Sequence, residues 1–235
     1  MSESVRLLIH GASGRMGQAL LRLCGESAGC TVVGAVTRKV GQRVVDGAPY
    51  FASAELHGTP ASDAIVDFSL PEAFDAVLAL AVERRIAFVS GTTGLSDAQR
   101  TALDVAAGSI PVLWAANFSL GVAILNELVE RAAAALPGWD CDIVESHHVH
   151  KKDAPSGTAL ALGRAAEQGG ATPRYASLRA GDIVGEHTVQ FTTVGERIEL
   201  VHRATNRDIF ARGALHAARL LAGRSPGKYA LRDLL

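Results

Sequence analysis

The chain has 235 residues, 48% of them hydrophobic and 20% charged, which is enough for one large or two modest folded domains and too apolar for a disordered protein. Its 23 basic and 24 acidic residues leave a net charge of −1, which excludes the broad positive surface of a protein that coats nucleic acid or an anionic membrane. No apolar run is long enough to span a membrane and the three cysteines form no Cys-x-x-Cys pair, so we expect a cytoplasmic protein that acts on a small molecule.

The first half of the chain alternates strand and helix patterns. The apolar run Val5–Ile9 predicts a buried strand, a glycine-rich turn follows, and Met16, Leu20 and Leu23 recur at helical spacing before a second strand over 31–36. The same alternation predicts strands over 64–68, 87–90 and 112–115, and helices over 71–84 and from Ser96 onward. Repeated alternation of this kind predicts an α/β fold with a Rossmann-type doubly wound parallel sheet, whose ligands lie beyond the carboxyl ends of the strands.

The pattern changes near residue 119 and predicts an α+β region. Ser119 is placed to cap a helix that Pro137-Gly138 ends, a strand follows around Ile143, and 158–167 is alanine-rich and helical. The stretch 188–202 alternates around Gly195-Glu196, which predicts an antiparallel hairpin, and Asn206 is placed to cap a last helix. The segment from Arg197 to Leu235 holds eight basic and three acidic residues, and no aromatic stacking platform is interleaved with them, so we interpret it as a solvated face or a subunit contact.

The glycine-rich turn has the spacing of a dinucleotide-binding loop. Gly11, Gly14 and Gly17 lie between the first strand and the first helix, where glycines permit a tight turn and a close approach of backbone N–H groups to a pyrophosphate. The second strand ends in Thr37-Arg38-Lys39 instead of an acidic residue that would bind a ribose 2′-OH, which favours NADPH over NADH. The alternatives are a plain tight turn and two cations that only solvate a loop.

Two further loops follow predicted strands of the sheet. They are Gly91-Thr92-Thr93-Gly94 and Ala115-Ala116-Asn117-Phe118. Because both come at carboxyl ends of strands, we expect them on the side to which the nicotinamide half of the cofactor extends.

The densest group of reactive side chains runs from Glu145 to Thr158. Three imidazoles and two ammonium groups within six positions attract an anion, and His147 can release a proton near neutral pH. Pro155-Ser156-Gly157-Thr158 opens a helix, so the N–H groups of Gly157 and Thr158 are placed to bind a carboxylate. A metal site built from His147, His148, His150 and Asp153 is the alternative, but the spacing matches no common metal motif; a solvated loop is the other alternative.

Several of these motifs together resemble one family. The sequence is similar to the 4-hydroxy-tetrahydrodipicolinate reductases, also called dihydrodipicolinate reductases, along almost its whole length. The matching motifs are Gly11 to Gly17, Gly91-Thr92-Thr93-Gly94, Ala116-Asn117-Phe118-Ser119, the block from Glu145 to Thr158, and the run from Arg179 to His187.

The resemblance implies a nucleotide-binding domain over 1–118, to which 204–235 returns, and a substrate domain over 119–203 whose open mixed sheet builds a homotetramer. It implies NAD(P)H-dependent reduction of 4-hydroxy-tetrahydrodipicolinate, a dicarboxylate of lysine and diaminopimelate biosynthesis, and the family often accepts both coenzymes. With the end of the second strand and the histidine spacing, we expect NADPH to be favoured, NADH to be possible and no metal to be bound. His147 matches the family's proton donor, Lys151 its second catalytic residue, and His148, Gly157 and Thr158 its substrate contacts. The family's cofactor contacts fall on Gly11, Ala12, Ser13, Gly14, Arg15, Met16, Arg38, Gly91, Thr92, Thr93, Ala115, Ala116, Asn117 and Phe118.

The sequence departs from the family pattern at one position, and it leaves two other functions open. Many family members carry an acidic residue where this chain has Thr37. The same nucleotide domain can serve reduction of another small carbonyl or imino acid, since a fold does not name a substrate. A catalytically silent NAD(P) sensor, with its basic C-terminal segment on a partner, is the alternative outside enzymes.

Overall fold

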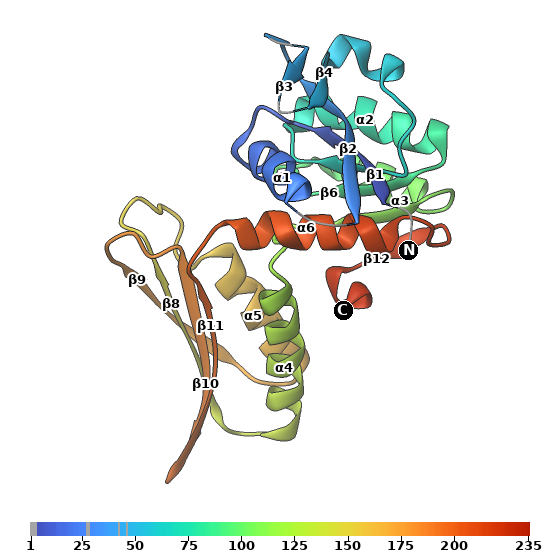
Figure 1. Ribbon diagram of the computed structural model, residues 1–235. Coiled ribbons are helices and arrows are strands. Elements are labelled where there is room, and N and C mark those ends of the chain that lie inside the picture. Colours follow the sequence, from blue (N-terminus) through green and yellow to red (C-terminus); the bar gives the residue numbers. More distant parts are fainter. Residues whose placement is uncertain (1–3, 27–28, 42, 46) are drawn as a thin grey trace. The chain divides into compact units, whose positions relative to one another are not determined.

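The computed structural model describes residues 4–26, 29–41, 43–45 and 47–235 (Figure 1). The chain divides into two compact units. The first unit comprises Met1–Phe118 together with Phe210–Leu235, and the second comprises Ser119–Ile209. Each unit has its own sheet, and none of the described helices is both long and apolar enough to cross a membrane.

The first unit is built on an eight-stranded sheet in the order β12-β7-β6-β5-β1-β2-β4-β3. All of its strand pairs are parallel except the pair of β3 with β4 at one edge. Its strands are β1 (Val5–His10), β2 (Cys30–Thr37), β3 (Val44–Val45), β4 (Ala48–Ala52), β5 (Ala64–Asp67), β6 (Ala87–Ser90), β7 (Pro111–Trp114) and β12 (Gly227–Tyr229). Its helices are α1 (Arg15–Gly25), α2 (Pro71–Arg84), α3 (Asp97–Ala106) and most of α6 (Asp208–Leu221), with short 3₁₀ turns η1 (Ser53–Gly58) and η2 (Leu231–Leu234).

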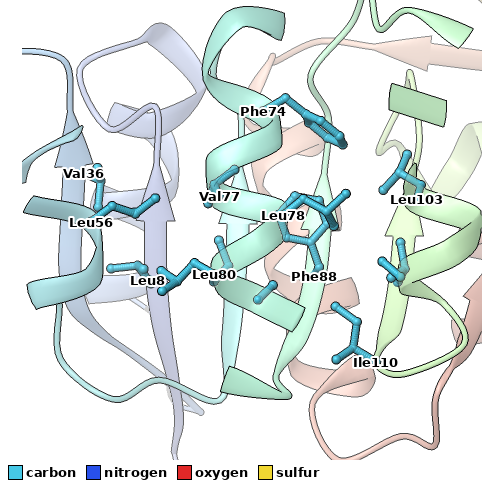
Figure 2. Close-up of a cluster of buried hydrophobic side chains, with 14 of the residues drawn as sticks. Leu8, Val36, Leu56, Phe74, Val77, Leu78, Leu80, Phe88, Leu103 and Ile110 are labelled. Carbon is cyan, nitrogen blue, oxygen red and sulfur yellow. The ribbon is translucent and has the colours of Figure 1, made fainter. Parts of the chain in front are cut away.

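Apolar side chains cover both faces of the central strands of this sheet. Leu7, Leu8 and Ile9 of β1 are all fully buried although neighbouring residues of a strand point to opposite faces. Figure 2 shows the cluster on one of the faces, where Phe74 and Val77 of α2 lie with apolar side chains of the strands and α3. Burial on both faces is the packing of a doubly wound α/β sheet, and it confirms the predicted fold class of the first half.

The second unit is a mixed four-stranded sheet in the order β11-β10-β8-β9, with two helices on one face (Figure 1). Its elements are α4 (Leu120–Ala135), β8 (Asp140–His147), α5 (Gly157–Gln168), β9 (Pro173–Arg179), β10 (Gly185–Thr193) and β11 (Glu196–Ala204). Both helices begin at a serine whose hydroxyl accepts a backbone N–H: Ser119 from Val122 and Ser156 from Ala159. Alternate residues of β8 and β10 face these helices and form the core with them, so the predicted α+β architecture is confirmed.

Candidate active site

A pocket of about 310 Å³ opens in the first unit at the carboxyl ends of β1, β2 and β5. The chain proceeds from β1 to β2 and β4 on one side, then returns to place β5 on the other side of β1. The pocket therefore lies at the switch point of the sheet, where doubly wound folds bind nucleotides. Of the predicted cofactor residues, Gly11, Ser13, Gly14 and Arg38 line it.

Two of the three predicted glycines are required by backbone approaches around this pocket. Gly11 has φ +79°, and a Cβ there would lie 2.4 Å from the carbonyl oxygen of Phe68. A Cβ on Gly17 would lie 2.4 Å from the carbonyl oxygen of Gly11, so α1 packs directly on the turn. Gly14 is the residue before α1 and is exposed, which places the first N–H groups of the helix at the pocket wall. This cradle fits the pyrophosphate of a dinucleotide.

Thr37 and Arg38, at the end of β2, have different surroundings. Thr37 is buried and its hydroxyl donates a hydrogen bond of 2.8 Å to the Ser13 hydroxyl, so it holds the glycine loop. Arg38 is exposed and lines the pocket, whereas Lys39 is exposed and is not among the lining residues. The cation at the pocket wall is therefore Arg38.

A buried carboxylate, Asp67, ties together the strand ends around the pocket. Its oxygens accept hydrogen bonds from the hydroxyls of Ser90 and Thr92, both at 2.8 Å, and one lies 2.7 Å from Nδ1 of His10. Burial alone would raise the pKa of Asp67, but hydrogen bonds and the charge of His10 lower it below its ordinary value. Asp67 thus stays ionised and fixes the end of β1 to the loop after β6.

The remaining predicted cofactor residues differ in their contacts and in their burial. Thr92 is buried on Asp67, a Cβ on Gly91 would overlap the Phe68 ring, and Phe118 is buried with its ring 5.4 Å from that ring. Ala12 is buried, Met16, Ala115 and Asn117 are half-buried, and Arg15, Thr93 and Ala116 are exposed. The loops 91–94 and 115–118 follow β6 and β7 at the carboxyl edge of the sheet, as expected from the sequence.

In the second unit, His147 is the last residue of β8 and is buried on the face that α4 and α5 cover. Its Nδ1 is hydrogen-bonded to the carboxylate of Glu145, two residues earlier on the same face. Burial lowers the pKa of His147, and the Glu145 carboxylate opposes this by stabilising the charged ring. Because Glu145 holds Nδ1, the ring nitrogen available for proton transfer is Nε2.

Glu145 is itself fully buried and is held by a guanidinium. Arg179 of β9 donates two hydrogen bonds, of 2.7 Å to Oε1 and 3.0 Å to Oε2 of Glu145. Burial would raise the pKa of Glu145, but hydrogen bonds from Arg179, Ser177 and His147 outweigh it and lower the pKa to about 2. The carboxylate beside His147 is therefore charged at neutral pH.

The loop after β8 carries the other predicted substrate and catalytic side chains. The Lys151 ammonium lies 2.8 and 2.9 Å from the two carboxylate oxygens of Asp153. His148 is half-buried, and its Nε2 lies 3.1 Å from a guanidinium nitrogen of Arg207. Gly157 and Thr158 form the first turn of α5, with Gly157 exposed. The positive charge of Lys151 and the N-terminus of α5 give this loop the groups that bind carboxylates.

The buried His187 adjoins His147 on the neighbouring strand, and the half-buried His202 lies beyond His187 on the next strand. His187 of β10 has its ring 5.2 Å from that of His147, and its Nε2 lies 3.1 Å from the Ser156 hydroxyl that caps α5. His202 of β11 lies directly opposite His187, with Nε2 3.3 Å from the Ser119 hydroxyl. Burial and the neighbouring charge of His147 lower the pKa of His187 to about 4, so His187 is neutral near pH 7. Among the described residues, no group of three or more His, Cys, Asp or Glu side chains is arranged to hold a metal ion.

The sequence did not single out Arg179, His187, His202 or Arg207 as site residues. They come from strands and loops far along the chain, and spacing gives no information on such distant pairings. Glu145 was within reach, because it lies two residues before His147 in a strand and must share its face.

The fold and the site together define a nicotinamide-dependent oxidoreductase: a Rossmann-type unit with a nucleotide pocket, and a second unit with a buried imidazole among groups that attract anions. Two family models match the chain, "Dihydrodipicolinate reductase, N-terminus" over residues 5–118 and "Dihydrodipicolinate reductase, C-terminus" over 121–235. The chain belongs to the dihydrodipicolinate reductase family, and its sequence-based assignment to that family is confirmed.

Similar proteins agree over the full length. The chain is 72% identical to a 4-hydroxy-tetrahydrodipicolinate reductase of Stenotrophomonas maltophilia (strain R551-3), with 98% of each chain covered. It is 68% identical to one of Xanthomonas campestris pv. campestris (strain B100), with 100% of this chain and 99% of the relative covered. A solved dipicolinate-bound dihydrodipicolinate reductase from Paenisporosarcina sp. TG-14 shares the fold, with a TM-score of 0.83 at 21% identity over 99% of this chain and 100% of that one.

Proposed function

We propose that the protein reduces 4-hydroxy-tetrahydrodipicolinate to tetrahydrodipicolinate, in lysine and diaminopimelate biosynthesis, and that His147 donates the proton. The reaction is proposed on the basis of membership of the dihydrodipicolinate reductase family. The observation that carries the role of His147 is its buried ring, held at Nδ1 by the ionised Glu145 beside a loop rich in cations.

The reduction requires loss of the 4-hydroxyl as water, one hydride and one proton on the ring of the substrate. The reduced nicotinamide supplies the hydride when it is bound. His147 carries the proton on Nε2 in its charged form and gives it to the carbon that hydride addition leaves electron-rich, after which the neutral ring keeps its Nδ1–H on Glu145.

The side chains after β8 bind the two carboxylates of the substrate in this proposal. Gly157 and Thr158 offer N–H groups at the positive end of α5, and the preceding loop adds the ammonium group of Lys151 and the imidazole of His148. Arg207, in contact with His148, adds a guanidinium that suits a carboxylate.

NADPH is the preferred coenzyme in the proposal and NADH the weaker one. The guanidinium of Arg38 lines the pocket at the end of β2, the position that meets the adenosine ribose in Rossmann-type folds. In NADPH this ribose carries a 2′-phosphate, which a guanidinium can bind and which the uncharged Thr37 does not repel.

We also propose a homotetramer formed through the face of the second sheet that points away from α4 and α5. Support comes from two apolar side chains on this face, Leu178 and Val201, which are 56% and 41% exposed in the single chain.

The test is a coupled assay in which the substrate is generated freshly and consumption of NADPH and NADH is followed. We expect turnover with both coenzymes, and His147→Gln to reduce kcat by about 10² to 10⁴ with coenzyme affinity nearly unchanged. Full activity of the variant would remove His147 from the mechanism. Coenzyme binding without any oxidation by the unaltered protein would support the silent nucleotide sensor instead.

A further inference from the structure

Arg179 joins the two parts of the candidate site that carry His147 and Lys151. On one side its guanidinium forms the paired hydrogen bonds with Glu145, which in turn holds Nδ1 of His147. On the other side it donates hydrogen bonds to two backbone carbonyl oxygens of the loop, 3.3 Å to Lys151 and 2.6 Å to Asp153. One side chain on β9 thus contacts the support of the proton donor and the backbone that carries Lys151.

We propose that Glu145 and Arg179 are positioning residues of the reaction: Glu145 fixes the ring and the proton of His147, and Arg179 fixes Glu145 and the 151–153 loop in one arrangement. The inference rests on the proposed role of His147 as proton donor. It adds two residues that touch neither substrate nor coenzyme in the proposed mechanism and act through His147 and Lys151.

The arrangement fixes which ring nitrogen carries the proton. An ionised carboxylate can only accept hydrogen bonds, so Glu145 requires a proton on Nδ1 of His147 in both charge states of the ring. Deprotonation therefore occurs at Nε2 alone. A glutamine at 145 can present its amide NH₂ to Nδ1 and so permits the opposite tautomer, in which Nε2 of the neutral ring keeps the proton.

The charge balance around His147 depends on Glu145. The groups that face the ring are Glu145 on β8, Arg179 on β9, His187 on β10 and Lys151 from the loop, where Lys151 is paired with Asp153. Burial, Lys151 and Arg179 all lower the pKa of His147, and among these four groups only Glu145 raises it. Without its charge the ring loses its proton at a lower pH.

Arg179 is the group on which the charge of Glu145 depends. Glu145 is fully buried, and a buried carboxylate without a partner becomes protonated. The bidentate geometry also fixes the plane of the carboxylate, which a lysine cannot do. The backbone carbonyl bonds of Arg179 then set the loop relative to that same plane.

The first arm of the test is Glu145→Gln in the full-length protein. We expect kcat to fall by about 10²-fold with the KM for substrate little changed, because the loop contacts of Arg179 remain. The proton donor must be charged to act, so activity falls as pH rises through the pKa of His147. We therefore expect the basic limb of the kcat profile to move to lower pH in the variant.

The second arm of the test is Arg179→Lys. It is accompanied by the double variant Glu145→Gln/Arg179→Gln, which removes both charges and so leaves no unpaired charge in the buried site. Both variants release the loop as well as the ring, so we expect kcat to fall and the KM for substrate to rise together. A fall in melting temperature with kcat, KM and the pH profile unchanged in folded variants would overturn the inference, since a purely structural pair has that signature.

The neighbouring pair Asp142–Arg174 supplies the matched control. It joins the same two strands by bonds of 2.7 and 2.9 Å but lies on the opposite face of the sheet. We expect Asp142→Asn to leave the pH profile and both kinetic constants unchanged; equal effects in this variant would attribute the losses to loosened strands and overturn the inference.

A double variant separates the inference from the proposed function on which it rests. If Glu145 acts through His147, His147→Gln/Glu145→Gln is no slower than His147→Gln alone. If the second substitution costs a further 10²-fold, Glu145 acts elsewhere and the inference fails, while the loss in His147→Gln still supports the proton donor. If His147→Gln is fully active, the proposed function of His147 fails first.

Discussion

At the residue scale, each unit holds an imidazole on a buried carboxylate, but the carboxylates are stabilised differently. Asp67 in the first unit accepts hydrogen bonds from two hydroxyls besides its contact with His10. Glu145 in the second unit is held by the guanidinium of Arg179. Hydroxyl donors at the end of β6 and in the loop after it suit a carboxylate that ties these segments together. A cation on an adjacent strand suits a carboxylate that must keep its charge beside a ring that gains and loses a proton.

A residue-scale prediction concerns Arg38. If its guanidinium binds a 2′-phosphate, Arg38→Ala should weaken NADPH by about tenfold to a hundredfold and leave NADH nearly unchanged, because only NADPH carries that phosphate. Binding of both coenzymes by calorimetry or fluorescence measures this. Lys39→Ala removes a neighbouring exposed cation that does not line the pocket, and it is the control. Equal losses for both coenzymes would place Arg38 elsewhere than at the 2′-position.

At the element scale, α1 is placed by the glycine loop that precedes it. A Cβ on Gly17 would lie 2.4 Å from the carbonyl oxygen of Gly11 and 2.6 Å from Cα of Ala12, which are backbone atoms that cannot turn away. Nothing lies within 4 Å of a Cβ on Gly25 at the other end of the same helix. One helix therefore offers the same substitution in two environments.

We expect opposite effects from alanine at these two positions. Gly17→Ala should destabilise the protein by about 1 to 3 kcal/mol and weaken coenzyme binding, since α1 must move off the loop. Gly25→Ala should stabilise it by up to about 1 kcal/mol, since alanine loses less conformational entropy in a helix. Urea unfolding and coenzyme titration measure both. A neutral Gly17→Ala variant would show that α1 does not depend on this contact.

Elements with a regular apolar pattern could be predicted from the sequence, and those without one could not. The helix predicted over Pro71–Arg84 and the strand over Ala87–Ser90 have those bounds in the structure, because their burial follows a helical or a fully buried strand pattern. Strand β9 was missed, since most of its residues are exposed and its order comes from pairing with β8. The edge strands β3 and β12, and β4 next to β3, were missed as well, because they are short or half-exposed.

The same limit applies to the candidate site. The block around His147 could be recognised because its residues are consecutive in the sequence. Arg179 and His187 follow His147 by 32 and 40 positions in the sequence. They lie near it because β9 and β10 pair with β8 in one particular register. Periodicity describes one element at a time and contains no information on register between distant strands.

At the scale of the whole molecule, the surplus positive charge of the C-terminal segment is divided rather than concentrated. Arg197 and Arg203 pair with Glu199 and Glu186 in the second unit. Lys228 and Arg232 belong to the first unit and lie 2.5 and 4.0 Å from carboxylates of Asp104 and Asp233. Each of these four cations has a carboxylate neighbour within its own unit, which lowers the local positive potential that a phosphate backbone would need.

We therefore expect no salt-dependent association with nucleic acid. Each phosphate that a protein neutralises on duplex DNA contributes about −0.9 to the slope of log affinity against log salt, so a basic patch of even four contacts gives a steep slope. Anisotropy of a short labelled duplex between about 50 and 200 mM salt measures it, with a basic DNA-binding protein as the positive control. Micromolar binding that weakens steeply with salt would contradict the expectation drawn from the paired charges and would favour a partner-binding role for the C-terminal segment. A titration without binding would agree with small anions, and not nucleic acid, as the ligands of the basic side chains.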